Sequence, residues 1–285
     1  MKLSLSLSWV ALCVLLSSCA SPWIRRPEID QIKKLAIVSI VANQRIKRTD
    51  GRGGAFSASN SNDWADTRVQ LIHYASEIFT KALRAATGWK IIPASEIVRN
   101  DRYRGIVAIA VDPETEKAEA VMVFAKEPAK DFVTLPGMEP LFLTQDSDFK
   151  PNPSRKKDKS VTDEMMAEQD QQEQQEKLRQ LAHALEVDAV ALIQLQFSYR
   201  RIPSQKGGFI AKPMLTSELN ILTKEGKLAL QTDRLNRTKR FLSDAEVPVI
   251  SGEMILEKAA TPYKRLIDQN VNFIVERIKK EFFAS

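Results

Sequence analysis

The sequence predicts an α/β domain in which a single mixed β-sheet is packed by helices. Residues 35–41 form a continuously apolar run rich in branched side chains, which is typical of a buried central strand. Apolar residues recur at helical spacing over residues 71–86 and again over 263–282. Together with the strand patterns between them, these segments predict the order β-α-β followed by α-β-β hairpin-α, an arrangement in which helices cover a sheet.

The first half of the domain has the pattern of a β-α-β unit. The helix after the first strand is indicated by apolar residues on one face, namely Leu71, Ala75, Ile78, Phe79, Ala82 and Ala86. Gly88 follows at the place where helices usually end. Residues 89–93 predict a second strand, and Ser95 is expected to cap a short helix after it. The two strands of such a unit are expected to be parallel.

The second half begins with an irregular insertion at about residues 105–160. This stretch shows neither helical nor strand periodicity clearly, and it contains several prolines. A helix is predicted over residues 162–186, with a burying stripe only in its last part. Residues 189–199 predict a strand that is apolar at first and then alternates, so that one of its sides is expected to face water.

A hairpin and a closing helix complete the predicted domain. Alternating residues at 215–221 and an apolar segment at 228–230 flank the turn 224–227, which is typical of a β-hairpin. Thr261 and Pro262 have the chemistry of a helix start, a cap followed by proline in the first turn. The final apolar stripe then predicts a long helix packed on the sheet.

The N-terminus predicts export and lipidation. Residues 1–18 carry one charge followed by an apolar stretch, which is typical of a signal peptide and too short to span a bilayer. Leu16, Ser17, Ser18 and Cys19 resemble a lipobox, in which the signal peptidase recognises the first three residues and the cysteine thiol accepts diacylglycerol. The alternatives are an ordinary signal peptide followed by a chance cysteine, or a buried apolar N-terminal strand.

Lipidation at Cys19 would fix the domain organisation and the compartment. We expect a signal peptide at 1–18, the lipidated cysteine with a proline-containing tether at 19–33, and the α/β envelope domain at 34–285. Ala20 is not the aspartate that retains enterobacterial lipoproteins at the inner membrane, so the resemblance implies the outer membrane with the domain in the periplasm. No thiol would remain for a disulfide, because Cys13 leaves with the signal peptide.

The formal net charge is +6, and the basic residues gather at 45–48, 155–157, 200–201 and 234–240. Export argues against nucleic acid as a partner. A positive field could attract an anionic envelope polymer, lipid headgroups or an envelope protein. The alternative is ordinary solvated charge on separate elements, because clusters that are distant in sequence need not form one patch.

No pattern of catalytic, metal-binding or cofactor-binding residues is present. His73 and His183 fall in predicted helices without metal-ligand spacing, and packing or surface roles suit them better. Gly51–Gly54 follow the first strand but lack both the dinucleotide spacing and the ending of a phosphate loop. There is no serine in a Gly-x-Ser-x-Gly elbow. We therefore predict no catalytic residue, no metal and no cofactor.

Three local segments, 32–38, 86–93 and 185–190, resemble a group of envelope lipoproteins and periplasmic domains. This group contains the penicillin-binding-protein activator lipoprotein B, the curli-secretion channel lipoprotein and the TolB amino-terminal domain. The resemblance implies an architecture and a location rather than a task. The leading hypothesis is a non-enzymatic binding or assembly module for another envelope protein or polymer. The alternatives are a subunit of an outer-membrane secretion channel and a peptidoglycan-acting envelope enzyme.

Overall fold

The computed structural model describes most of the predicted domain. The described residues are 23–44, 46–49, 63–107, 132–141, 175–232, 241–250, 253–255 and 258–282. The predicted signal peptide, the lipobox residues Leu16, Ser17, Ser18 and Cys19, and Gly51–Gly54 lie outside these ranges. Within the described ranges, no helix is both long enough and apolar enough to cross a membrane.

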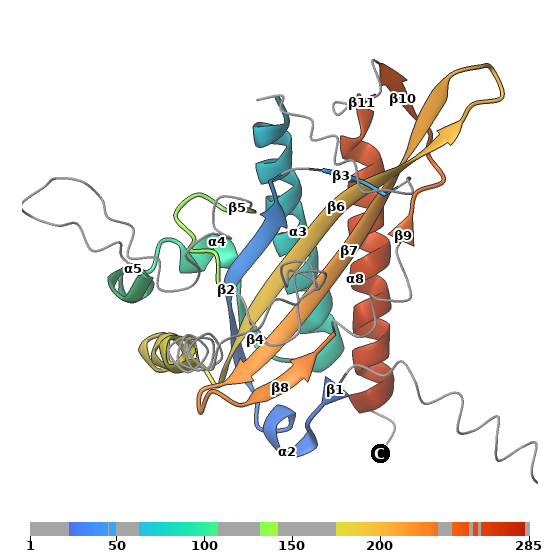
Figure 1. Cartoon of the computed structure of the whole chain (residues 1–285). Helices are drawn as coiled ribbons and strands as arrows, with labels where there is room; N and C mark the ends of the chain where they lie inside the picture. The colour runs from blue at the N-terminus through green and yellow to red at the C-terminus, as the bar shows by residue number, and fades with distance from the viewer. Residues whose placement is uncertain are drawn as a thin grey trace, which may run out of the picture.

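One mixed β-sheet forms the centre of the fold (Figure 1). Its main strands follow the spatial order β1-β8-β7-β6-β2-β4. Their bounds are β1 Trp23–Ile24, β2 Lys34–Asn43, β4 Lys90–Ile92, β6 Ala189–Pro203, β7 Phe209–Thr223 and β8 Leu228–Gln231. β2 pairs in parallel with both β4 and β6, whereas β6–β7, β7–β8 and β1–β8 are antiparallel. The predicted α/β fold with a mixed sheet is therefore confirmed.

Short strands extend the sheet along the long β6–β7 hairpin. β3 Lys47–Arg48 pairs in parallel with β6, and β5 Phe132–Thr134 pairs antiparallel with β2. On the other side, β9 Phe241–Leu242 and β10 Val247–Ile250 both pair with β7, and β11 Glu253–Met254 pairs with β10. Past the point where β2 and β8 end, the hairpin is therefore still flanked by strands, with β3 beside β6 and with β9 and β10 beside β7.

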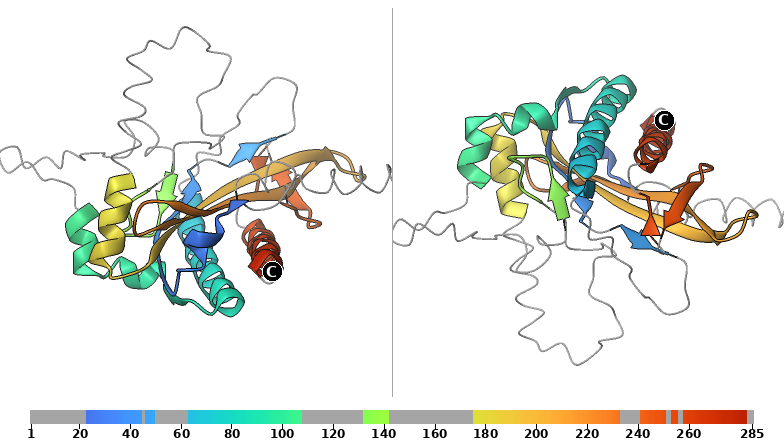
Figure 2. Two further views of the ribbon diagram at one scale, coloured as in Figure 1. Left: turned by 90° about the horizontal axis from the view of Figure 1, so that it is seen from below. Right: turned by 90° about the horizontal axis from the view of Figure 1, so that it is seen from above.

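Two long helices, α3 Asp63–Thr87 and α8 Ala260–Phe282, lie side by side on one face of the sheet (Figures 1 and 2). Three shorter helical segments, α4 Ala94–Ile97, α5 Asp101–Val107 and residues 175–184, gather beside β2 and β5. A further short helix, α2 Arg26–Ile29, lies next to β8.

The apolar stripes predicted from sequence form the core between sheet and helices. β2 is buried along almost its whole length, as expected for a strand with neighbours on both sides and cover on both faces. The two long helices contribute the buried residues Leu71, Ala75, Phe79, Leu83, Ile267, Val271, Ile274 and Ile278. Each of the leucine, isoleucine, valine and phenylalanine side chains among them contributes roughly 1.5–3 kcal/mol when buried, so this layer stabilises the fold substantially.

The folded domain begins earlier than the sequence suggested. Residues 23–33 were expected to belong to the tether, but β1 pairs with β8, and Ile29 and Ile32 are almost completely buried. The backbone N–H of Arg25 also donates to the Ala229 carbonyl at 3.0 Å. The prolines that suggested a tether are compatible with structure, because Pro27 lies in the first turn of α2, where its missing N–H costs nothing.

Part of the predicted insertion also belongs to the fold. Residues 132–141 supply β5 and three buried side chains, Leu135, Met138 and Leu141. Ile106 and Val107, at the start of the insertion, complete α5. The remaining residues of the insertion lie outside the described ranges. Period alone could not identify β5, because three residues are too few to establish an alternation.

Two local expectations are wrong. The N-cap of α4 is Pro93, without a side-chain hydrogen bond, so Ser95 lies inside that helix rather than capping it. The polar side of β6 is not open to water as its alternation suggested, because Gln194 and Ser198 are buried. β6 lies in the middle of the sheet between β2 and β7, so neither of its edges is open to solvent, and Gln196 on the same face is only half-buried.

Candidate functional site

The β6–β7 hairpin extends past the ends of the two long helices, and we call its far part the hairpin end, meaning residues 198–214 together with β3 (Figure 1). The two strands stay in register up to the pair Pro203–Phe209. The connecting turn requires glycine, since Gly207 and Gly208 have φ values of 87° and 77°. The N–H of Ser204 donates to the Gly208 carbonyl at 3.1 Å and closes the turn.

Two basic clusters that are far apart in sequence meet at the hairpin end. Lys47 pairs with Ser198 and Arg48 with Tyr199, so β3 runs beside the segment that continues into Arg200 and Arg201. β2 pairs in parallel with the first part of β6, and β3, which follows β2 in sequence, pairs in parallel with the next part of β6. The structure thus places two of the four basic clusters side by side, whereas the clusters at 155–157 and 234–240 lie outside the described residues.

The exposed residues of the hairpin end combine positive charge with an aromatic ring. Arg200 and Lys206 are exposed and Lys212 is half-buried, and none of the three forms an ion pair with another described residue. Phe209 is 48% exposed, and the Arg201 guanidinium carbon lies 4.3 Å from the centre of its ring. A guanidinium over a ring face is a favourable cation–π contact that keeps both groups at the surface.

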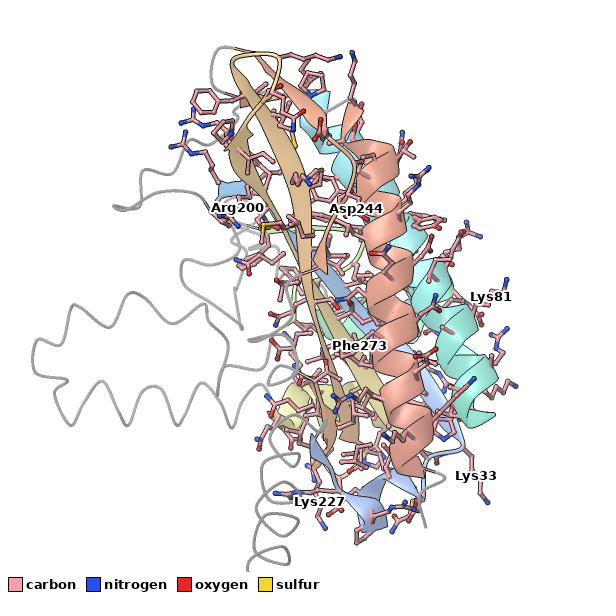
Figure 3. The ribbon with its side chains drawn as sticks, turned by 90° about the vertical axis from the view of Figure 1, so that its right-hand side faces the viewer. Lys33, Lys81, Arg200, Lys227, Asp244 and Phe273 are labelled. Atoms are coloured by element: carbon pink, nitrogen blue, oxygen red, sulfur yellow. The ribbon has the colours of Figure 1, made fainter. Side chains whose placement is uncertain are left out.

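Acidic residues also lie close to the hairpin end, namely Asp244, Glu246 and, in β11, Glu253. Asp244 and Glu246 lie in the connection between β9 and β10 and are exposed. Figure 3 shows Asp244 on the side of the sheet that carries α8, whereas Arg200 points to the opposite side. The hairpin end therefore presents positive charge on the face away from α8.

Buried hydrogen bonds hold the hairpin end in place. The Tyr263 hydroxyl, on the first turn of α8, donates to the Ser198 carbonyl at 2.7 Å, and its ring meets Phe197 edge to face at 5.0 Å. Burial raises the pKa of the Tyr263 hydroxyl well above its usual value. On the other side of β6, the Asn43 side chain donates to the Phe197 carbonyl at 2.9 Å and accepts from the Phe197 N–H at 2.6 Å. These contacts give the surface a fixed geometry.

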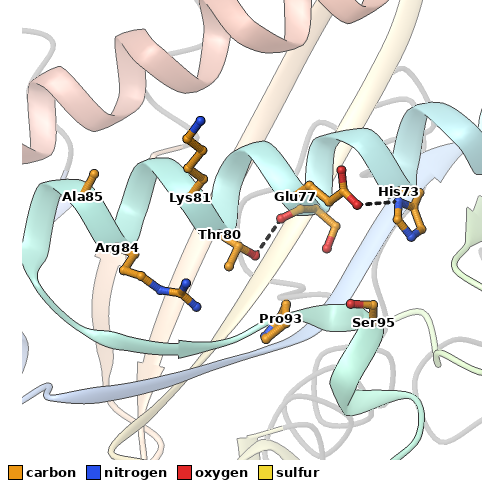
Figure 4. Close-up of a pocket in the computed structure, with 9 residues that line it drawn as sticks. His73, Glu77, Thr80, Lys81, Arg84, Ala85, Pro93 and Ser95 are labelled. Atoms are coloured by element: carbon orange, nitrogen blue, oxygen red, sulfur yellow. Dashed lines mark hydrogen bonds and ion pairs between the residues drawn. The ribbon is translucent and has the colours of Figure 1, made fainter.

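A second feature is an open groove of about 540 Å³ between α3 and the start of α4 (Figure 4). His73 and Glu77 lie one turn apart on its α3 wall with 3.3 Å between Nδ1 and Oε1, and both side chains are more than half exposed. The Arg84 guanidinium donates to the Ile91 carbonyl at 3.0 Å, which ties α3 to β4. Ser95 forms part of the opposite wall.

The structure does not bring the two histidines together. His73 lies in the groove, and His183 is exposed on helical residues 175–184. Among the residues that the structure describes, no group of three His, Cys, Asp or Glu side chains could hold a metal ion. The sequence singled out the two basic clusters, but Phe209 was not among the candidate residues. An aromatic residue directly after a Gly-Gly turn was the available signal.

No protein-family model, no curated protein and no solved structure matches this chain. The resemblance to envelope lipoproteins given above therefore stays a prediction.

Proposed function

We propose that this chain is a lipoprotein of the bacterial outer membrane, anchored through lipid on Cys19, whose periplasmic domain binds another envelope component and does not catalyse a reaction. The observation that supports a binding role is the hairpin end, where Arg200 and Lys212 lie on one face of the β6–β7 ribbon and Arg201 and the exposed Phe209 on the other. Its partner is an anionic envelope polymer or the acidic surface of another envelope protein. Complementary charge accelerates such encounters and selects among partners.

The arrangement of the chain suits this role. β1 lies at the end of the sheet opposite to the hairpin end, and Trp23 is four residues after Cys19. At about 3.4 Å per residue, the stretch of β7 between Ile221, which pairs with β8, and Phe209 is about 40 Å long. A lipid anchor near β1 would thus leave the hairpin end free to reach a partner away from the membrane.

Crosslinking in cells tests this proposal. A photoreactive amino acid in place of Phe209 is expected to trap a specific partner, either a discrete protein band or a polydisperse polymer. The double substitution Arg200→Glu and Lys212→Glu should abolish the product, whereas Lys81→Glu, on an exposed position of α3, should leave it intact. Equal crosslinking in all three proteins would reject the hairpin end as the binding surface.

The anchor is tested separately by the mass of the protein purified from its own membrane. Acylated Cys19 as the first residue is the expected result, and Cys19→Ser should release the protein from the membrane fraction. An unmodified cysteine or an intact leader in the purified protein would refute the lipid anchor, whatever the crosslinking result.

A further inference from the structure

The end of the domain opposite to the hairpin end carries a second group of cations. We call this end the base, meaning residues 23–34, the turn 223–228 and the last turns of α8. Its exposed lysines are Lys33, Lys224, Lys227, Lys279 and Lys280. None of these ammonium groups forms an ion pair with another described residue. Figure 3 shows Lys33 and Lys227 at the same end of the molecule, with the end of α8 between them.

Several acidic groups near the base are already engaged by the protein itself. The Asp188 carboxylate accepts the backbone N–H groups of Lys33 and Lys34 at 3.0 and 2.9 Å. Glu186 pairs with Arg102 at 2.5 Å, and this contact lowers the pKa of the Glu186 carboxyl.

Five other acidic residues belong to the base itself. Asp30 lies 3.9 Å from Arg26, a pair in which both side chains are about half exposed. Glu28, Glu225, Glu276 and Glu281 carry the remaining negative charge. Against these five carboxylates, residues 23–34, 223–228 and 276–282 contain nine Lys and Arg side chains, so the base has a formal net charge of +4.

We propose that the base docks on the surface of an anionic lipid bilayer and that its lysines contact the headgroups. This inference rests on the proposed lipid anchor, because the anchor decides what lies beneath the base. Trp23 pairs with Gln231 at the base, and a fully extended chain spans at most about 3.5 Å per residue. The four residues from Cys19 to Trp23 therefore hold Trp23, at the base, within about 14 Å of Cys19. This distance is comparable to the Debye length of about 8–10 Å, so exposed lysines there experience the surface potential of the bilayer.

The docked base determines the orientation of the domain. Two or three acyl chains already hold a lipoprotein in the membrane essentially permanently, so the lysines add little to retention. Their contacts instead keep the sheet upright, with the hairpin end pointing away from the membrane. The two basic ends of the molecule thus have different partners: lipid headgroups at the base and an envelope component at the hairpin end.

Binding to vesicles of defined composition tests the docking without the contribution of the acyl chains. The protein is the mature chain from residue 19 with Cys19→Ser, mixed with vesicles of phosphatidylcholine alone or of phosphatidylcholine with phosphatidylglycerol. We expect binding only to the anionic vesicles, with an affinity that falls as salt is added. Each lysine near such a surface contributes a factor of about 5, so the triple substitution Lys224→Gln, Lys227→Gln and Lys279→Gln should weaken binding roughly a hundredfold.

A comparison variant with the same change in net charge separates local contact from overall charge. It carries Lys81→Gln, Arg99→Gln and Arg265→Gln, three exposed cations outside both the base and the hairpin end, and should bind the anionic vesicles within about 5-fold of the unsubstituted chain. Equal losses in the two triple variants would overturn the proposal, as would a larger loss in this comparison variant or no binding to anionic vesicles at all. Because this protein lacks lipid, the outcome is independent of the mass measurement that tests the anchor and of the crosslinking that tests the hairpin end.

Discussion

Replacing Tyr263 by phenylalanine tests how the hairpin end is attached to the helical layer. The Tyr263 side chain is completely buried, and its hydroxyl donates to the Ser198 carbonyl at 2.7 Å. Phenylalanine keeps the ring and its edge-to-face contact with Phe197. The planes of these two rings are inclined at 77° to each other. The substitution therefore removes one hydrogen bond and leaves the packing almost unchanged.

The expected cost follows from the burial. A buried acceptor that loses its donor costs about 1–3 kcal/mol in the free energy of unfolding. For a domain of this size, each kcal/mol lowers the melting temperature by about 2–4 °C. We therefore expect Tyr263→Phe to lower the melting temperature by roughly 2–12 °C, measured by circular dichroism or calorimetry.

Tyr74→Phe is the matched control. The Tyr74 hydroxyl donates to Asp268 at 2.7 Å between α3 and α8, but the Tyr74 side chain is only half-buried, so water can replace the lost hydrogen bond. We expect less than about 1 kcal/mol from this change. If Tyr263→Phe were as mild as Tyr74→Phe, the buried hydrogen bond would not hold the hairpin as we argue.

The pH dependence gives an independent check on the same residue. Burial raises the pKa of Tyr263 in the folded protein above its unfolded value of about 10. The contribution of the neutral Tyr263 hydroxyl to the free energy of unfolding is fully present below about pH 10. It is lost as the pH rises further, because the hydroxyl ionises there in the unfolded chain but not in the folded protein. The urea midpoint should thus fall above pH 10, and it should fall less in Tyr263→Phe. Identical alkaline profiles for the two proteins would refute the assignment.

Three other substitutions test particular contacts by their effect on urea unfolding. Asn43→Ala should cost about 2–4 kcal/mol, because it removes two buried hydrogen bonds to the Phe197 backbone; a loss below 1 kcal/mol would contradict that role. Gly207→Ala should cost about 1–2 kcal/mol through its φ of 87°, whereas alanine at Gly105, whose φ is not positive, should not destabilise the protein. Arg102→Ala should cost less than about 1 kcal/mol, since its ion pair with Glu186 is exposed; a larger loss would show that the pair is structural.

Much of the fold could be predicted because its elements are long and strongly patterned. The apolar run that became β2 and the stripes of α3 and α8 are determined by local period, and the structure places them as expected. Short elements escaped prediction for the opposite reason. β1, β3 and β5 have two or three residues each, and only their pairing with β8, β6 and β2 makes them strands.

The candidate site shows the same division. The basic clusters at 45–48 and 200–201 were visible in the sequence, but whether they shared a surface was not. Their contact depends on the parallel pairing of β3 with β6, which joins residues about 150 positions apart. Sequence spacing carries no information on such a contact, because it results from the path of the whole chain around the sheet.

The sequence by itself determined the fold class, the two packing helices and the prediction of export and lipidation, since period and a short N-terminal motif are local properties. The tertiary structure alone decided where the folded domain begins, how far the β6–β7 hairpin extends beyond the helices, and that cations occupy both ends of the sheet. The physical reason is that burial and the summed electrostatic field depend on which distant segments lie together, and only the completed packing of the chain fixes those neighbours.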